Sequence, residues 1–258
     1  MMTELTITDL TNMHAGRICV AGVNDKGESI RPQFRRQHFM REWCTSGGQV
    51  IRPFSKIQLD LIERKCSPPH TEDWIIADDC IKLTGEVEKA KRQYFLEKLL
   101  DPDVESIFGA KIQHIKDEGT FTNSGEGNRS LGTIRVKRTY LFSNKCFEDN
   151  RHDCRISFLD AADKWYRLKI VDLTFQTYVD HLRSKPLSAE EVSKMIDRTF
   201  YRKDIYMRIG LSRGWGMHPE RCYLQINGVY TFPDYLEGKC FTDFEAPTKD
   251  NEIVDFSI

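Results

Sequence analysis

Arginine and aromatic residues are interleaved in one segment near the N-terminus, residues 31–43 (RPQFRRQHFMREW). Guanidinium groups hold phosphates and aromatic rings stack on bases, so this combination is typical of proteins that grip single-stranded nucleic acid. The alternative is an ordinary loop, with its arginines in solvent and its rings tucked into the core. The segment predicts nucleic-acid contacts by Arg31, Arg35, Arg36, Arg41 and Trp43.

A second segment of this kind, residues 208–215 (RIGLSRGW), contains two glycines that allow close approach of the backbone to a ligand. It adds Arg208, Arg213 and Trp215 to the predicted binding residues. Arg135 and Lys137 stand two positions apart in a strand-like run and would project from the same strand face. Such a face is more often solvated than occupied, but we include both residues in the predicted interface.

Catalytic and metal-binding motifs are not recognisable. The histidines are isolated from any nucleophile context, and the glycine pairs match neither a P-loop nor a dinucleotide fingerprint. We therefore predict no catalytic residue, no metal and no cofactor. Enzyme chemistry stays open as an alternative only if the fold gathers carboxylates such as Asp160, Asp163 and Asp172 around a divalent cation.

Composition limits the functional class. The formal net charge of the 258 residues is −1, so nothing in the overall charge favours a polyanionic partner. Basic residues outnumber acidic ones about two to one only locally, between residues 17 and 65. The eight cysteines include no C-x-x-C pair, and no apolar run approaches the roughly 18 residues that span a bilayer. We expect a cytoplasmic protein with reduced thiols.

The apolar pattern is mostly that of β-strands. Runs with strand-like composition or alternation, the first of them a hairpin around residues 24–27, cover residues 16–32, 55–64, 131–142, 154–159, 165–175, 205–215 and 221–236. Helical spacing occurs in residues 86–100 and 187–200, and the second helix has a capping-box pattern of Ser188 and Glu191. Residues 117–132 are rich in Gly, Ser, Asn and Thr and read as a loop.

This order of elements predicts a mainly β protein of two tandem OB-like barrels with a few helices. The predicted domains are residues 1–118 and 133–258, joined by a linker at 119–132. A single α+β domain with a split sheet is the competing architecture.

Three stretches of the chain carry a family resemblance: MHAGRICVAGVNDKGESIRP, YRLKIVDLTF, and RIGLSRGW followed by CYLQINGVYTFPDYLEG. Together they resemble the dual OB-fold domain family of prokaryotes, over about residues 5–244. The resemblance implies two tandem OB-like barrels, a role in nucleic-acid recognition, and an association with bacterial conflict or antiphage systems.

The leading hypothesis is a binding module without catalytic activity that grips single-stranded or distorted DNA or RNA. One alternative is an adaptor that docks onto a partner protein from the same defence operon, favoured by the near-neutral charge and the aromatic-rich segment 223–235. The other is an enzyme that processes nucleotides or nucleic acid.

Overall fold

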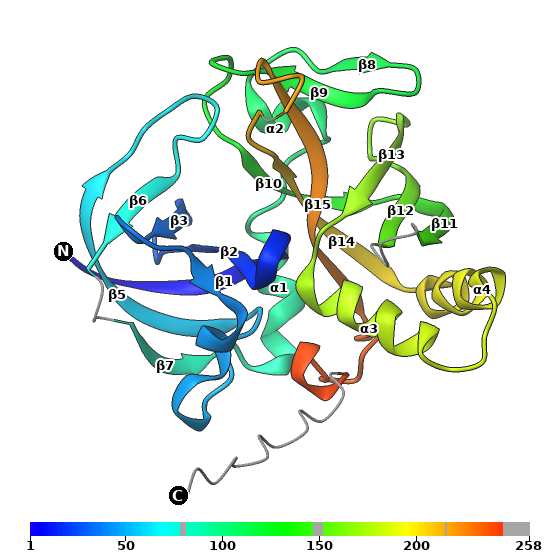
Figure 1. The fold of residues 1–258 in the computed structure, drawn as a ribbon, viewed down its shortest axis with the longest axis horizontal. Coiled ribbons are helices and arrows are strands. Elements are labelled where there is room, and N and C mark those ends of the chain that lie inside the picture. Colours follow the sequence, from blue (N-terminus) through cyan, green and yellow to red (C-terminus); the bar gives the residue numbers. More distant parts are fainter. Residues whose placement is uncertain (78–80, 147–151, 215, 245–258) are drawn as a thin grey trace, which may run out of the picture.

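The fold is mainly β, and in the computed structural model its strands form two sheets that lie side by side (Figure 1). The structure describes residues 1–77, 81–146, 152–214 and 216–244. The strands of the first sheet are β1 (Met2–Asn12), β2 (Arg17–Val23), β3 (Ser29–Gln33), β4 (Phe39–Met40), β5 (Ser55–Arg64), β6 (Asp73–Ile76) and β7 (Lys82–Glu86). Those of the second sheet are β8 (Gln113–Ile115), β9 (Gly119–Asn123), β10 (Leu131–Val136), β11 (Arg138–Cys146), β12 (His152–Leu159), β13 (Trp165–Ile170), β14 (Asp204–Leu211) and β15 (Arg221–Phe232).

Helices are short and few within the described residues. The α-helices are α1 (Arg92–Glu97), α2 (Glu105–Phe108), α3 (Leu173–Arg183) and α4 (Ala189–Phe200). The 3₁₀ turns are η1 (His14–Gly16), η2 (Arg41–Gly48), η3 (Lys89–Lys91) and η4 (Phe241–Asp243). None of these described helices is long and apolar enough to cross a membrane.

The first sheet closes on itself. Strand β1 pairs antiparallel with β2 on one side and with β5 on the other, and the path β2-β3-β6-β5 completes the ring. Alternation explains which side of each strand faces inward: in β5, Ile57, Leu59 and Leu61 are buried, whereas the residues between them are more exposed. The short strands β4 and β7 stand outside this ring and pair only with β2 and β5.

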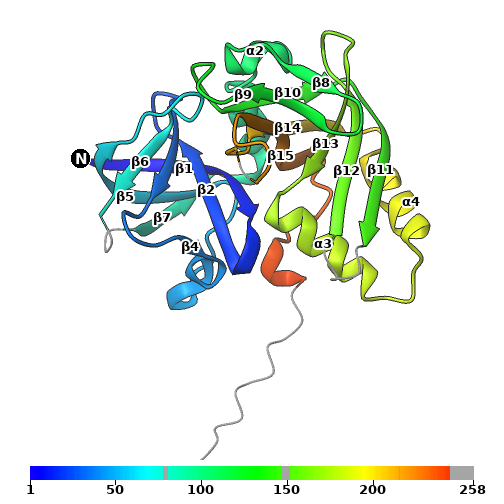
Figure 2. The ribbon, with the colours of Figure 1, turned by 45° about the horizontal axis from the view of Figure 1, so that its top comes forward.

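The second sheet runs in the order β10-β14-β15-β13-β12-β11 and curves into a half-barrel. Helices α3 and α4 lie against it (Figure 2), and Val179, Val192 and Ile196 share one buried core with strand residues such as Phe142 and Phe158. The sheets also share buried apolar residues: Leu173 of α3 belongs to the core of the first sheet. The predicted mainly β architecture with two OB-like units is confirmed.

Several sequence predictions match individual elements. Strands β2 and β3 form the predicted hairpin, and β5 has the predicted bounds. Helix α4 begins with the predicted capping box, in which the Ser188 side chain accepts from the Glu191 backbone N–H and the Glu191 carboxylate accepts from the Ser188 N–H. The helix predicted at 86–100 is shorter, because α1 covers only Arg92–Glu97 after the turn η3.

Two strand predictions in the second half of the chain were wrong. The run 165–175 is not one strand: β13 ends at Ile170, and Asp172 starts helix α3 by accepting a hydrogen bond of 3.1 Å from the Phe175 N–H. The run 131–142 is divided between β10 and β11. The predicted linker 119–132 contains β9, which pairs with β15. The division of the chain into domains at residue 118 stays a prediction.

The cap of α3 predicts a pH dependence of stability. Burial raises the pKa of the Asp172 carboxyl to about 7, although the N–H groups of Phe175 and Val229 partly oppose the shift. In the unfolded chain an aspartate titrates near 3.9, so between about pH 4 and 7 only the unfolded chain gives up this proton. The free energy of unfolding therefore falls as pH rises, by at most about 1.4 kcal/mol per pH unit from this group.

We expect Asp172→Asn, which is neutral at every pH, to lack this contribution while losing one hydrogen bond at all pH values. Urea unfolding of both proteins at pH 4.5, 6 and 8 measures the difference between them, in which the other titrating groups cancel. The wild-type advantage over Asp172→Asn should shrink as pH rises. Parallel pH profiles would show that the Asp172 carboxyl is not protonated in the folded protein.

Candidate nucleic-acid interface

A cavity of about 650 Å³ lies where the two sheets meet. Its wall comes from both: the ends of β1 and β2, strand β3 and the following residues 34–38 belong to the first sheet, and Leu211, Gln225 and Asn227 belong to the second. A backbone hydrogen bond joins the two sheets at the wall of the cavity. In it the Asn12 N–H donates to the Val171 carbonyl oxygen at 2.8 Å. The fold thus brings segments about 200 residues apart to one opening.

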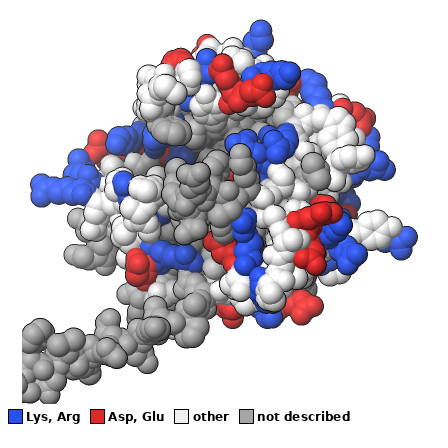
Figure 3. Space-filling view, turned by 45° about the vertical axis from the view of Figure 1, so that its right-hand side comes forward, with Lys and Arg blue, Asp and Glu red and all other residues white. Residues whose placement is uncertain are grey.

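Charge distinguishes this cavity. Among the described residues that line it, none is Asp or Glu, and five are basic: Arg31, Arg35, Arg36, Lys65 and Arg213. The molecule as a whole has no such imbalance, and Figure 3 shows basic and acidic groups interspersed over one of its faces. Several amide side chains also line the cavity: Asn12, Gln33, Gln37, Gln225 and Asn227. The opening therefore combines positive charge with groups that can donate and accept hydrogen bonds.

A second cavity, of about 560 Å³, lacks this charge imbalance. Its wall is largely aromatic and apolar and includes Phe54, Tyr230 and Tyr235. Both signs of charge line it, for example Arg52 and Lys89 with Asp234 and Glu237. Its acidic residues offset much of the charge of its basic ones, so it attracts a phosphate chain less than the first cavity does.

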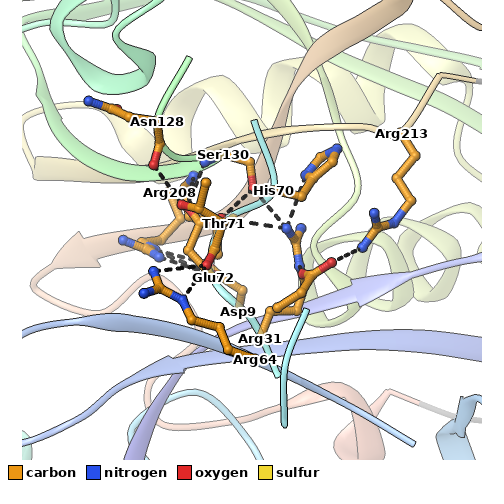
Figure 4. Close-up of polar contacts among 12 residues, drawn as sticks. Asp9, Arg31, Arg64, His70, Thr71, Glu72, Asn128, Ser130, Arg208 and Arg213 are labelled. Atoms are coloured by element: carbon orange, nitrogen blue, oxygen red, sulfur yellow. Dashed lines mark hydrogen bonds and ion pairs between the residues drawn. The ribbon is translucent and has the colours of Figure 1, made fainter. Parts of the chain in front are cut away.

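Asp73, the first residue of β6, fixes two of the cavity's arginines from behind. Its Oδ1 accepts from Arg31 Nε at 2.6 Å, and its Oδ2 accepts from Arg213. The two arginines are labelled in Figure 4. Burial raises the pKa of the Asp73 carboxyl, but the two guanidinium groups outweigh this effect and hold the pKa below its ordinary value. The carboxylate therefore stays ionised and holds Arg213, which is 51% exposed, at the rim.

His70 is a further buried partner of Arg31. Its Nδ1 lies 3.0 Å from Arg31 Nη2, and because arginine only donates, Nδ1 is the acceptor. Burial and the positive charges of Arg31 and Arg213 lower the pKa of His70 to about 3. The imidazole is therefore neutral at physiological pH and acts as a hydrogen-bond partner of Arg31.

A second buried arginine joins the sheets directly. Arg208 of β14 holds Asp9 of β1 through a two-pronged ion pair, with Nε at 3.0 Å from Oδ1 and Nη2 at 3.1 Å from Oδ2. Its Nη1 donates to the Thr133 hydroxyl at 2.8 Å. Arg208 is 2% exposed and Asp9 is 1% exposed. This ion pair links β1 of the first sheet to β14 of the second within the core.

Glu72 and Ser130 add a further buried connection between the sheets. The Glu72 carboxylate accepts from the backbone N–H groups of Ser130, at 2.5 Å, and Leu131, at 3.1 Å. The Ser130 hydroxyl in turn accepts from Arg31 at 2.8 Å. Strand β10 therefore begins at a point held by residues of the first sheet.

The predicted binding residues differ in where the structure places them. Arg35, Arg36 and Arg213 line one cavity and are exposed, as the sequence interpretation requires, although Arg35 also pairs with Glu63 at 2.7 Å. Arg31, which lines the cavity, and Arg208 are both buried in ion pairs, and their contact with a ligand stays a prediction. A guanidinium group in the core must be paired with carboxylates, and here both have such partners.

Other predicted residues lie away from the opening. The Arg41 side chain donates to Thr177 and lies over the Phe241 ring, and Trp43 packs edge-on against Phe39, at 4.9 Å between ring centroids. The Trp43 ring therefore supports the core, as in the alternative interpretation of its segment. Arg135 and Lys137 are exposed and pair with Asp204 and Asp163. Trp215 lies outside the described residues.

Sequence reasoning missed Lys65, the remaining exposed basic residue of the cavity. Its only signal in the sequence was its place at the end of the basic region, directly after the strand 55–64. Asp73 and Glu72 were missed as well, because an acidic residue that orients an arginine across a sheet leaves no pattern along the chain.

The carboxylates considered for metal chemistry serve structural roles. Asp160 accepts from the backbone N–H groups of Ala162 and Lys164, Asp163 pairs with Lys137, and Asp172 caps α3. Within the described part of the chain, no group of three or more His, Cys, Asp or Glu residues is placed to hold a metal ion. The three aspartates do not form the site that the enzyme alternative requires.

Comparison with known proteins places the chain in a family. The model of the dual OB-containing domain matches residues 6–229. The chain belongs to this family. No curated protein matches it.

Among solved structures, the chain is similar to one described as a replication protein A heterotrimer bound to single-stranded DNA, with 8% identity and a TM-score of 0.35. The alignment covers 88% of this chain and 49% of that one, so this protein spans about half of its length. At this TM-score, the similarity carries no argument about function.

The buried Asp9–Arg208 pair predicts a large loss of stability when one partner is removed. Asp9→Asn leaves the Arg208 charge buried without its carboxylate, and we expect the free energy of unfolding to fall by about 3–5 kcal/mol. The double variant Asp9→Leu/Arg208→Met, which removes both charges, should recover most of this loss. Urea unfolding followed by circular dichroism measures both.

The matched control is Asp204→Asn, which breaks the exposed pair with Arg135 and should cost about 0–1 kcal/mol. If Asp9→Asn costs no more than Asp204→Asn, the pair does not hold the sheets together.

Proposed function

We propose that this protein binds single-stranded or distorted DNA or RNA, with the cavity between the two sheets as the contact site. The observation that carries the proposal is the charge of that cavity: basic groups line it from both sheets, and its described lining includes no acidic residue. Phosphate contacts by Lys and Arg supply most of the sequence-independent affinity for nucleic acid. OB-type barrels are a fold used for such ligands.

The exposed basic side chains of the cavity would contact phosphates, and its amide side chains would contact other parts of the strand. Arg36 and Lys65 present their charges to solvent, and Arg213 is oriented by Asp73 with half of its side chain exposed. Arg35 is held only by an exposed ion pair with Glu63, which is worth about 0–1 kcal/mol and can exchange for a phosphate. The lining amides can then bond to sugars or base edges.

The cavity limits how much of a strand can enter. Its volume of about 650 Å³ is within the usual range of small-molecule sites, roughly 300–1,000 Å³. Only a short part of a nucleic acid fits inside, so the rest of the strand must lie on the surface. Free ends, unpaired bases or distorted positions would enter more easily than an intact duplex.

The role in bacterial defence rests on the family resemblance of the sequence alone. Its test is a plating assay in which a host carrying this gene and its neighbours is challenged with phage. Reduced plaque formation that is lost with an Arg36→Ala/Lys65→Ala variant would connect the cavity to defence, and equal plaque counts with and without the wild-type gene would contradict the role.

We expect Arg36→Ala/Lys65→Ala to weaken binding to a labelled 20-nucleotide single strand, because two phosphate contacts are lost. Fluorescence anisotropy at several salt concentrations gives the dissociation constant and the slope of log K against log salt. The wild-type affinity should fall steeply with salt, and the slope should become shallower by about 1.4 in the variant, at about 0.7 per contact. Poly-dT, poly-rU and a duplex of equal length identify the preferred form.

The matched control is Lys26→Ala/Lys194→Ala, which makes the same change in net charge at two exposed sites, the β2–β3 turn and helix α4. The proposal predicts nearly unchanged binding for this control. It is wrong if the cavity variant and the control lose affinity equally, or if the wild-type protein binds none of the three nucleic acids.

A further inference from the structure

The outer face of strands β11, β12 and β13 carries aromatic and basic side chains that the cavity does not use. Residues directly opposite one another in antiparallel strands project from the same face. The observed register therefore places three residues in one row and three in another along this face: Arg138, Leu159 and Trp165, then Ser143, Arg155 and Lys169. Arg167 lies between the rows, opposite Ser157.

Two large rings stand in solvent at one end of this face. Tyr140 is 71% exposed and Trp165 is 53% exposed, and their ring centroids are 5.5 Å apart. The rings meet at 78°, so they form a corner in which a planar group can stack on one ring with its edge against the other. Exposed apolar surface that is contiguous, as these two rings are, can mark a binding site.

Charge on the same face favours an anionic partner. Of the charged residues described here, Arg138, Arg155, Arg167 and Lys169 are basic, and Asp153 is acidic. Asp153 accepts from Arg155 at 2.6 Å and lies 3.9 Å from Lys169. Arg167 donates to the neutral Ser143 hydroxyl at 2.9 Å, so its charge is not neutralised there. Trp165, Arg167 and Lys169 are every second residue of β13 and project from the same face. Each of them stands roughly 7 Å along the strand from the next.

From these observations we infer that the outer face of β11–β13 is a second contact surface for single-stranded nucleic acid. A base stacks in the Tyr140–Trp165 corner, and the sugar–phosphate chain passes over Arg167 and Lys169. The inference rests on the proposed function and specifies it: the strand is unpaired, because the bases of a duplex offer no free ring face for stacking. Figure 3, which turns the right-hand part of Figure 1 forward, shows basic side chains interspersed with acidic ones on this side of the molecule.

Trp165 supplies its own signal for a test. Titration of the wild-type protein with unlabelled (dT)₂₀ should quench part of the tryptophan fluorescence, and Trp165→Phe should remove that part while keeping a stacking ring and a dissociation constant within about threefold. Trp165→Ala should raise the dissociation constant roughly 5- to 150-fold, the range expected when one stacked base is lost. Arg167→Ala/Lys169→Ala should also weaken binding and reduce its salt dependence.

The matched control is Tyr201→Ala, which removes another exposed aromatic ring, 67% exposed, from the end of helix α4. Urea unfolding confirms that each variant is folded before binding is compared. The inference is overturned if Trp165→Ala binds (dT)₂₀ as the wild type does, or if Tyr201→Ala loses as much affinity.

These outcomes separate the two proposals. Binding that depends on Arg36 and Lys65 but not on Trp165 overturns this inference and leaves the cavity as the site. Binding that depends on Trp165 alone supports the outer face and contradicts the cavity. Absence of any binding by the wild type overturns both.

Discussion

The Asp9–Arg208 ion pair is the contact on which the arrangement of the two sheets depends. Both side chains are almost fully buried, and each satisfies the charge that the other brings into the core. The pair joins β1 of the closed ring to β14 of the half-barrel and, together with the Glu72–Ser130 contacts, fixes how the sheets face each other. The cavity exists only in that arrangement, since its wall comes from both sheets. A buried pair is weak evidence for net stability, but it specifies one geometry over others.

The same principle separates structural from exposed arginines around the cavity. Arg31 lies inside with Asp73, Glu72 and His70 around it, whereas Arg213 shares Asp73 but extends to the rim. The ionised carboxylate of Asp73 therefore anchors the buried Arg31 and orients the exposed Arg213. A ligand that meets Arg213 finds a side chain already held in place, which lowers the ordering cost of binding.

The sequence predicted local structure well where a single segment contains its own signal. The alternation in residues 55–64 and the Ser188–Glu191 cap were sufficient for β5 and α4. Helix α3 was missed because the apolar residues after Ile170 continue a strand-like run, and the capping role of Asp172 was not recognised. The site was predicted in part: Arg36 and Arg213 line the cavity, but the partners of Arg31 and Arg208 lie 42 and 199 residues away, and no spacing along the chain reveals them.

The most direct test of the central claim, that nucleic acid binds in the cavity between the sheets, is photochemical crosslinking. A single strand carrying 5-iodouracil is crosslinked to the wild-type protein, and the modified peptides are mapped by mass spectrometry. The account predicts adducts within residues 33–39 or 211–213, which line the opening. Crosslinks confined to other parts of the chain would contradict it.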